Sequence, residues 1–136
     1  MKYTKATNYA LHIMAFMVNQ EGTENISLQP LAKHLDMSPT YLSKILTQLV
    51  KANLIHSATG VNGGYNLRKK REEITFFDVV QAIEGSGALF TCEMNEEECH
   101  LQKVMREAER RLEDYLQSKT IYEVTKDSSL HGNCER

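Results

Sequence analysis

Apolar side chains recur at three- and four-residue spacing between positions 42 and 49, which is typical of a helix with one buried face. Ser38 can cap the first turn of this helix, and Pro39 suits its first position because proline has no N–H to lose. The predicted buried stripe consists of Leu42, Ile45, Leu46 and Leu49. The remaining faces carry short polar and basic side chains, namely Thr40, Tyr41, Ser43, Lys44, Thr47 and Gln48.

A shorter amphipathic stretch, residues 28–35, precedes this helix and follows Ser27, another residue that can cap a helix. The connection between the two helices, residues 36–38, is short enough to set them at a sharp angle. This arrangement is typical of a helix-turn-helix, whose second helix enters the major groove of DNA.

Two short strand patterns, residues 54–58 and 65–68, flank a glycine-rich turn directly after these helices. In DNA-binding proteins a hairpin in this position is a wing, whose glycines let the backbone approach phosphates or enter the minor groove. The competing interpretation, a glycine-rich cradle for a nucleotide, lacks the strand-loop-helix order and the Lys-Ser/Thr ending. Upstream, residues 5–20 predict a first helix that supplies the core.

Residues 75–84 predict a further helix, opened by the capping-box pair Thr75 and Asp78. Residues 96–118 predict one long helix with apolar residues at heptad-like spacing: Leu101, Met105, Ala108, Leu112 and Tyr115. Because the preceding elements already make a globular domain, we expect this seam to form a homodimer interface rather than to pack on its own domain. A short final helix and a disordered tail are expected to follow.

Composition and charge add two constraints. At 136 residues and 41% hydrophobic content, the chain suits one domain that gains from a partner subunit. Residues 1–75 carry nine Lys and Arg against five Asp and Glu, a net charge of +4. Because the whole chain has a net charge of −2, the remaining residues carry −6. A basic N-terminal part is the expected footprint of phosphate contact. No apolar run reaches the roughly 20 residues that span a bilayer, so we expect a cytoplasmic protein without a membrane partner.

These motifs together resemble a known family. The segments Ser38-Pro39-Thr40-Tyr41-Leu42, Gly63-Gly64-Tyr65-Asn66-Leu67 and 74–85 are similar to those of the Rrf-two-type bacterial winged helix-turn-helix transcriptional regulators, the IscR-, NsrR- and CymR-like family. The resemblance covers the chain from residue 1 to about residue 125. One departure is Thr59, where relatives often carry Arg before the wing glycine.

The resemblance implies a mainly α fold with a small β-hairpin, in which a winged helix-turn-helix domain is followed by a long C-terminal dimerisation helix. It also implies a homodimeric transcription factor that binds a near-palindromic operator in double-stranded DNA. The expected divisions are a DNA-binding domain over residues 1–85, a sensor loop over 86–95, the dimerisation helix and short final helix over 96–125, and a disordered tail over 126–136.

The chain has three cysteines, Cys92, Cys99 and Cys134, and Cys99 is expected in the first turn of the long helix. Relatives with an iron–sulfur cluster place three cysteines around this segment, whereas here Met105 lies near the third position. His100 can supply a nitrogen ligand, but four ligands are reached only if Cys134 folds back. Three alternatives stay open: a cluster held by Cys92, Cys99 and His100, a thiol switch among the cysteines, or cysteines without a sensing role.

The predicted DNA contacts in the major groove come from Ser38, Thr40, Tyr41, Ser43, Lys44 and Gln48. Among them, Thr40, Ser43 and Lys44 are placed to reach base edges, whereas Ser38, Tyr41 and the wing would hold phosphates. The wing itself would be shaped by Gly60, Asn62 and Gly63.

The predicted function is therefore a sequence-specific transcriptional regulator, expected to be a repressor, that responds to redox or iron–sulfur status through Cys92 and Cys99. One alternative is a regulator whose signal is a small molecule or a partner protein. Another is a protein-interaction module that does not bind DNA. An enzyme is disfavoured because the sequence contains no positioned base or cleft motif.

Overall fold

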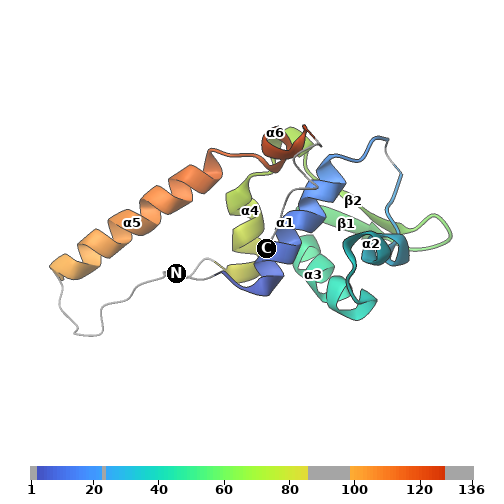
Figure 1. Cartoon of the computed structure of the whole chain (residues 1–136), viewed down its shortest axis with the longest axis horizontal. Coiled ribbons are helices and arrows are strands. Elements are labelled where there is room, and N and C mark those ends of the chain that lie inside the picture. Colours follow the sequence, from blue (N-terminus) through green and yellow to red (C-terminus); the bar gives the residue numbers. More distant parts are fainter. Residues whose placement is uncertain (1–2, 23, 86–98, 128–136) are drawn as a thin grey trace.

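The computed structural model describes residues 3–22, 24–85 and 99–127, and within them the chain is mainly helical with one two-stranded antiparallel sheet (Figure 1). The predicted fold class, mainly α with a small β-hairpin, is confirmed. The predicted sensor loop, Cys92 and Cys134 lie outside the described residues. The elements in chain order are α1 (Lys5–Val18), α2 (Leu28–Leu35), α3 (Pro39–Lys51), β1 (Ile55–Ala58), β2 (Gly64–Leu67), the 3₁₀ turn η1 (Arg71–Glu73), α4 (Phe76–Glu84), α5 (His100–Gln117) and α6 (Ile121–Thr125).

Helix α1 forms the centre of the core and packs against α3, α4 and α6. Its inward face, which includes Ile13, Met14 and Val18, is fully buried. Helices α2, α3 and α4 and strand β1 add aliphatic side chains to the same cluster. Ile121 of α6 is only 1% exposed and joins this core as well. Helix α6, which follows α5 in the sequence, is therefore part of the globular body. The local sequence pattern did not indicate this packing.

Backbone hydrogen bonds fix the return of the chain to the body. The Ile121 N–H donates to the Ile74 carbonyl at 3.0 Å, and the Phe76 N–H donates to the Lys119 carbonyl at 2.9 Å. These bonds join the connection between α5 and α6 to the start of α4. The C-terminal end of α5 is thereby anchored next to α4.

Helices α2 and α3 form the predicted helix-turn-helix. Asp36 ends α2 in the left-handed conformation, with φ of 54°, and turns the chain toward α3. Ser38 Oγ then accepts a hydrogen bond from the Tyr41 N–H at 3.1 Å, with Pro39 in the first turn, as the sequence predicted. The four side chains of the predicted stripe are each at most 1% exposed: Leu42, Ile45, Leu46 and Leu49.

The β-hairpin is attached to the helix-turn-helix. Strands β1 and β2 pair antiparallel, with Ala58 opposite Gly64 at the end nearest the loop. The segment before α2 pairs with the same hairpin, because Ile26 and Tyr65 exchange two backbone hydrogen bonds of 2.8 Å. Figure 1 places the hairpin loop and the free end of α5 at opposite ends of the molecule.

Helix α5 projects from the globular body (Figure 1), and none of its 18 residues is buried. It begins at His100, later than the predicted start at residue 96. Cys99 is its N-cap residue, with extended backbone (φ −69°, ψ 111°), so the prediction that Cys99 lies within the first turn was wrong. No helix in the described ranges is long and apolar enough to cross a membrane.

Glu84, the last residue of α4, joins that helix to the start of α1. Its carboxylate accepts hydrogen bonds from the Thr7 hydroxyl and from both the backbone N–H and the hydroxyl of Thr4, the latter two at 2.9 Å. These donors, Thr7 foremost, hold the pKa of the Glu84 carboxyl below its ordinary value of 4.5. Because Thr7 is only 2% exposed, its hydroxyl depends on this acceptor.

Replacing Glu84 with Ala is expected to lower the free energy of unfolding at neutral pH by about 1–2 kcal/mol, because the buried Thr7 hydroxyl loses its acceptor. A carboxyl whose pKa is lowered by folding stabilises the folded state above its unfolded pKa, and this contribution is lost as pH falls through the folded pKa. In urea unfolding, the gap between wild type and Glu84→Ala should therefore narrow below pH 4.5. Glu84→Gln, which keeps an acceptor, should lose less, and a gap independent of pH contradicts this account.

Candidate nucleic-acid interface

The face of α3 opposite its buried stripe is polar and open to solvent. Thr40, Lys44 and Thr47 are exposed, and Ser43 and Gln48 lie half-buried beside them. Their spacing of three and four residues places them on one side of the helix. Short hydroxyl side chains let a backbone come close to a partner, and the cation of Lys44 can reach further. This face therefore has the shape and chemistry to contact base edges and phosphates.

Two residues of this face were not among the predicted contacts. Thr47 lies between the predicted positions, although its hydroxyl donates to the Ser43 carbonyl at 2.8 Å and so is partly engaged with its own helix. Lys51 is exposed and lies two turns after Lys44 on the same side. The helical period that identified the buried stripe would also have found both, by extending the opposite face to the end of the helix.

The residues predicted to hold phosphates also fix the start of α3. The Ser38 hydroxyl oxygen is engaged by the Tyr41 N–H. The half-buried Tyr41 ring packs edge-on against Tyr9 of α1, with 5.6 Å between ring centroids and an interplanar angle of 85°. Such edge-to-face contacts stabilise an aromatic pair. The first turn of α3 is therefore braced against α1 by a contact between residues far apart in the sequence.

The hairpin loop, residues 59–63, brings the predicted wing residues into one tight turn. The Gly63 N–H donates to the Gly60 carbonyl at 3.0 Å, and Gly60 has φ of +100°. A Cβ on Gly63 would lie 2.5 Å from the Ala58 carbonyl oxygen, so only glycine fits there. The Asn62 carbonyl accepts a hydrogen bond from Asn25 Nδ2 at 2.9 Å, which ties the loop to the segment before α2.

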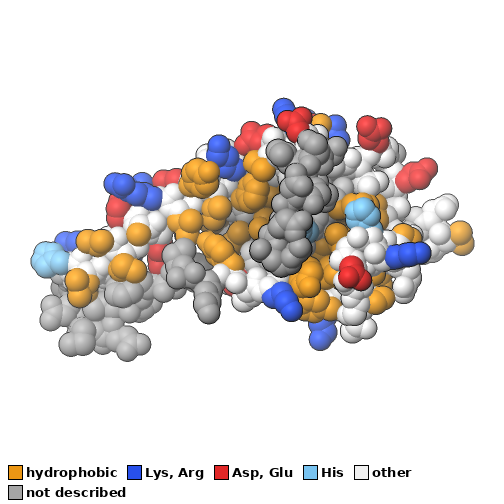
Figure 2. All heavy atoms as spheres, viewed as in Figure 1, with side chains coloured by type: hydrophobic (Ala, Val, Ile, Leu, Met, Phe, Trp, Pro, Cys, Tyr) orange, Lys and Arg blue, Asp and Glu red, His pale blue; other side chains and the backbone are white. Residues whose placement is uncertain are grey.

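Charge around the helix-turn-helix and hairpin is mainly positive. Residues 25–70 contain six Lys and Arg but one acidic residue, Asp36. Lys33, Lys44 and Lys51 are exposed on α2 and α3. Figure 2 shows Lys and Arg side chains along the lower edge of the body, where α3 lies in Figure 1. A surface of this sign attracts the phosphate backbone of a nucleic acid.

A second candidate surface runs along α5. Most of its apolar residues share one stripe along the helix: Leu101, Val104, Met105, Ala108, Leu112 and Tyr115. The exposed fraction is 74% for Leu101, 68% for Val104 and 62% for Tyr115. The heptad pattern omitted Val104, although its position one turn after Leu101 places it on the same stripe. Exposed apolar surface of this extent is typical of protein–protein contact sites.

The opposite face of α5 is covered by ion pairs. The Glu107 carboxylate accepts hydrogen bonds from Arg110 and, at 3.0 Å, from Arg111, and these lower the pKa of Glu107 to about 2. Arg110 also lies 3.4 Å from Asp114. Helix α5 is therefore amphipathic, and four large side chains of its apolar stripe are exposed in the described chain: Leu101, Val104, Met105 and Tyr115.

The predicted metal ligands are only partly within the described chain. Cys99 and His100 are adjacent at the start of α5. An iron–sulfur cluster needs four protein ligands, mostly cysteine thiolates. Among residues 3–22, 24–85 and 99–127, no three His, Cys, Asp or Glu side chains are grouped so that they could hold a metal ion. These residues alone therefore do not fit a cluster.

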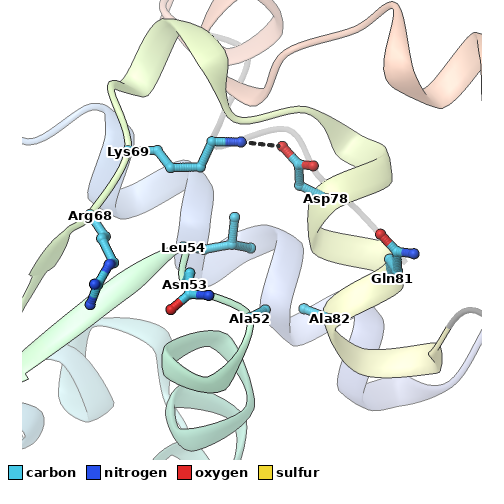
Figure 3. A pocket seen from close by; sticks show the side chains of 8 residues that line it. All are labelled: Ala52, Asn53, Leu54, Arg68, Lys69, Asp78, Gln81 and Ala82. Atoms are coloured by element: carbon cyan, nitrogen blue, oxygen red, sulfur yellow. Dashed lines mark hydrogen bonds and ion pairs between the residues drawn. The ribbon is translucent and has the colours of Figure 1, made fainter.

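A shallow groove lies where the end of α3, the base of the hairpin and α4 meet (Figure 3). Lys69 Nζ lies 3.2 Å from Asp78 Oδ2 across it, and the same carboxylate accepts a hydrogen bond from the Thr75 N–H at 3.0 Å. Lys69 and Asp78 therefore pair with each other, and the groove marks where these three elements pack together. The lining residues are Ala52, Asn53, Leu54, Arg68, Lys69, Asp78, Gln81 and Ala82.

Sequence comparison finds one family. The family model Rrf2, described as an iron-dependent transcriptional regulator, matches residues 3–127. The HTH-type transcriptional regulator YffB of Lactococcus lactis is 36% identical over 66% of this chain, and the match spans 58% of YffB. Protein aau3 of Rhizobium meliloti is 33% identical over 93% of this chain and 86% of its own length.

A solved structure shares the fold. CymR (YrzC), the global cysteine regulator of B. subtilis, matches with a TM-score of 0.78 and 25% identity, covering 93% of this chain and 97% of CymR. The family resemblance predicted from the sequence is confirmed by these similarities.

Proposed function

Because the chain belongs to the Rrf2 family of transcriptional regulators, we propose that it is a homodimeric repressor that binds operator DNA through α3 and the β1–β2 hairpin. The observation that carries this proposal is the exposed polar and basic face of α3, opposite a fully buried stripe. Thr40, Ser43 and Lys44 face the base edges of the major groove. Ser38, Tyr41 and the wing lie toward the phosphate backbone of the DNA. The positive charge around these elements supports phosphate binding.

The apolar stripe of α5 is the proposed homodimer contact. Two copies packed along this stripe would remove its leucine, valine and tyrosine side chains from water. A twofold axis through the pair presents two copies of α3 to one side of a duplex. Half-sites in such dimers lie about 34–36 Å apart, one turn of B-DNA, and the operator then has near-palindromic sequence.

Lys44→Ala tests the assignment of α3. We expect about tenfold weaker binding to an operator duplex, because the contact between the Lys44 ammonium group and the DNA is lost. The slope of log affinity against log salt concentration should also become shallower by about 1, since one fewer cation is bound to the DNA. Lys103→Ala, on the outer face of α5, is the matched control and should change neither quantity. Fluorescence anisotropy over a salt series measures both. Equal binding by Lys44→Ala and wild type contradicts this placement of α3, and no salt-dependent binding by wild type favours a protein-interaction module.

We also propose that the signal acts at the start of α5. Cys99 is the N-cap residue of this helix, and Cys92 precedes Cys99 by seven residues in the sequence. Hydrogen peroxide would join the two sulfur atoms in a disulfide, while the two thiol protons and two electrons reduce the peroxide to two waters. A bond at this end of α5 constrains the dimer helix and thereby the spacing of the two α3 helices.

Cys99→Ser is expected to abolish any change in operator affinity caused by peroxide, because one partner of the disulfide is missing. Mass spectrometry of treated wild type should find the Cys92–Cys99 linkage, and Cys134→Ser should retain it. A disulfide that includes Cys134, or no disulfide, contradicts this pairing. Operator affinity that is equal for oxidised, iron-loaded and reduced protein favours the alternative, a small molecule or partner protein as the signal.

A further inference from the structure

The hairpin loop of residues 59–63, here the wing tip, ends in an apolar side chain. Val61 has a relative exposure of 104%, the highest of any large hydrophobic residue in the described chain. Figure 2 shows a hydrophobic side chain at the far end of the hairpin, away from the body. An isolated valine held this far from the protein makes no contribution to the core.

The hairpin carries no charge with which to bind phosphates. Residues 55–67 contain no Lys, Arg, Asp or Glu. Its contribution to DNA binding therefore cannot come from a side-chain cation and the counterions that a cation releases. Neutral contacts are what this element offers: backbone N–H groups, uncharged polar side chains and apolar surface.

The wing tip is narrow and held in place. Gly60 and Gly63 flank Val61 and Asn62, so two of the five loop positions have no side chain. The loop is closed by the bond between Gly63 and Gly60 and tied down by the bond from Asn25 to the Asn62 carbonyl. The β-branched side chain of Val61 has few rotamers. Little conformational freedom is therefore lost when this tip enters a partner's groove.

We propose that Val61 enters the DNA minor groove beside the major groove read by α3 and selects A·T over G·C base pairs there. This inference rests on the proposed function and names a specificity-determining residue for it. The minor-groove edge of an A·T pair shows only the adenine N3 and thymine O2 acceptors, whereas a G·C pair adds the guanine N2 amino group. The valine methyl groups fit the floor of the minor groove at an A·T pair. At a G·C pair the guanine amino group occupies the same space. Contact with valine would also remove water from that amino group without offering it a hydrogen-bond acceptor.

The test uses the full chain and a duplex selected by the wild-type protein. Val61→Ser is expected to bind it about tenfold more weakly, because burial of the valine methyl groups is lost. The salt slope should stay unchanged, in contrast to Lys44→Ala, since no charge is removed. Val124→Ser on α6, where Val124 is 44% exposed, is the matched control and should bind as wild type does.

Base substitution identifies the groove. G·C pairs are placed one at a time across the flanks of the selected site, and each is compared with the inosine·cytosine pair, which lacks the amino group but keeps the major-groove edge. Wild type should lose affinity at one flank position in each half-site and recover it with inosine, whereas Val61→Ser should not distinguish the two. Unchanged affinity of Val61→Ser, or no recovery with inosine, overturns this inference and leaves the proposed function standing. Absence of salt-dependent binding by wild type overturns both.

Discussion

Aspartate at both Met105 and Leu112 will convert the protein from dimer to monomer and weaken operator binding by about 100-fold or more. Both side chains lie on the apolar stripe of α5, where Met105 is 43% exposed and Leu112 is half-buried, so each carboxylate would be buried without a partner in the dimer contact. The DNA affinity falls because a monomer binds only one half-site, whereas the two linked subunits of a dimer bind both half-sites at once. The fold of each subunit should survive, since no residue of α5 is buried.

Sedimentation equilibrium and anisotropy with an operator duplex measure the two effects. The matched control replaces Lys103 and Gln117, on the opposite face of α5, with aspartate. It should remain dimeric and bind as wild type does, and circular dichroism should show equal helix content in all three proteins. A dimeric Met105→Asp, Leu112→Asp double variant contradicts the assignment of this stripe.

Replacing Gly64 with Ala will destabilise the protein by about 3 kcal/mol. Gly64 has φ of +140°, and a Cβ there would lie 2.5 Å from the Ile26 carbonyl oxygen. That oxygen belongs to the backbone pair that joins Ile26 to Tyr65, so relief of the clash costs the two hydrogen bonds that attach the hairpin. The free-energy cost of the strained backbone and the cost of the lost hydrogen bonds therefore add.

Gly60→Ala separates these two causes. Gly60 also has positive φ, +100°, but nothing lies within 4 Å of the position of an added Cβ. Its substitution should cost about 1 kcal/mol from backbone strain alone. Urea unfolding of the three proteins gives both free energies. Equal losses in the two variants contradict the close approach of the hairpin to Ile26.

The parts of the fold that the sequence predicts are those with local signals. The 3.6-residue period places Leu42, Ile45 and Leu49 in the core, and the cap and proline at Ser38 and Pro39 locate the start of α3. The same period, read on the opposite side, assigns the polar face that is the candidate interface. The glycines around the loop locate the hairpin because few other residues adopt its backbone conformations.

The parts that the sequence does not predict depend on contacts between distant segments. Helix α6 has only five residues, too few for a period, and its burial through Ile121 follows from pairing with the start of α4. The hydrogen bonds that Glu84 accepts from Thr4 and Thr7 likewise join segments that are far apart in the sequence. The predicted sensor residue Cys92 lies outside the described residues, so its role stays a prediction.

Selection of binding sites from a pool of random duplexes tests most directly whether a dimer reads DNA through two α3 helices. The account predicts that wild-type protein enriches an inverted repeat whose half-sites are centred about 10 base pairs apart. Enrichment of a single unrepeated site contradicts the dimeric arrangement, and recovery of no preferred sequence contradicts the assignment of α3 as the reading helix.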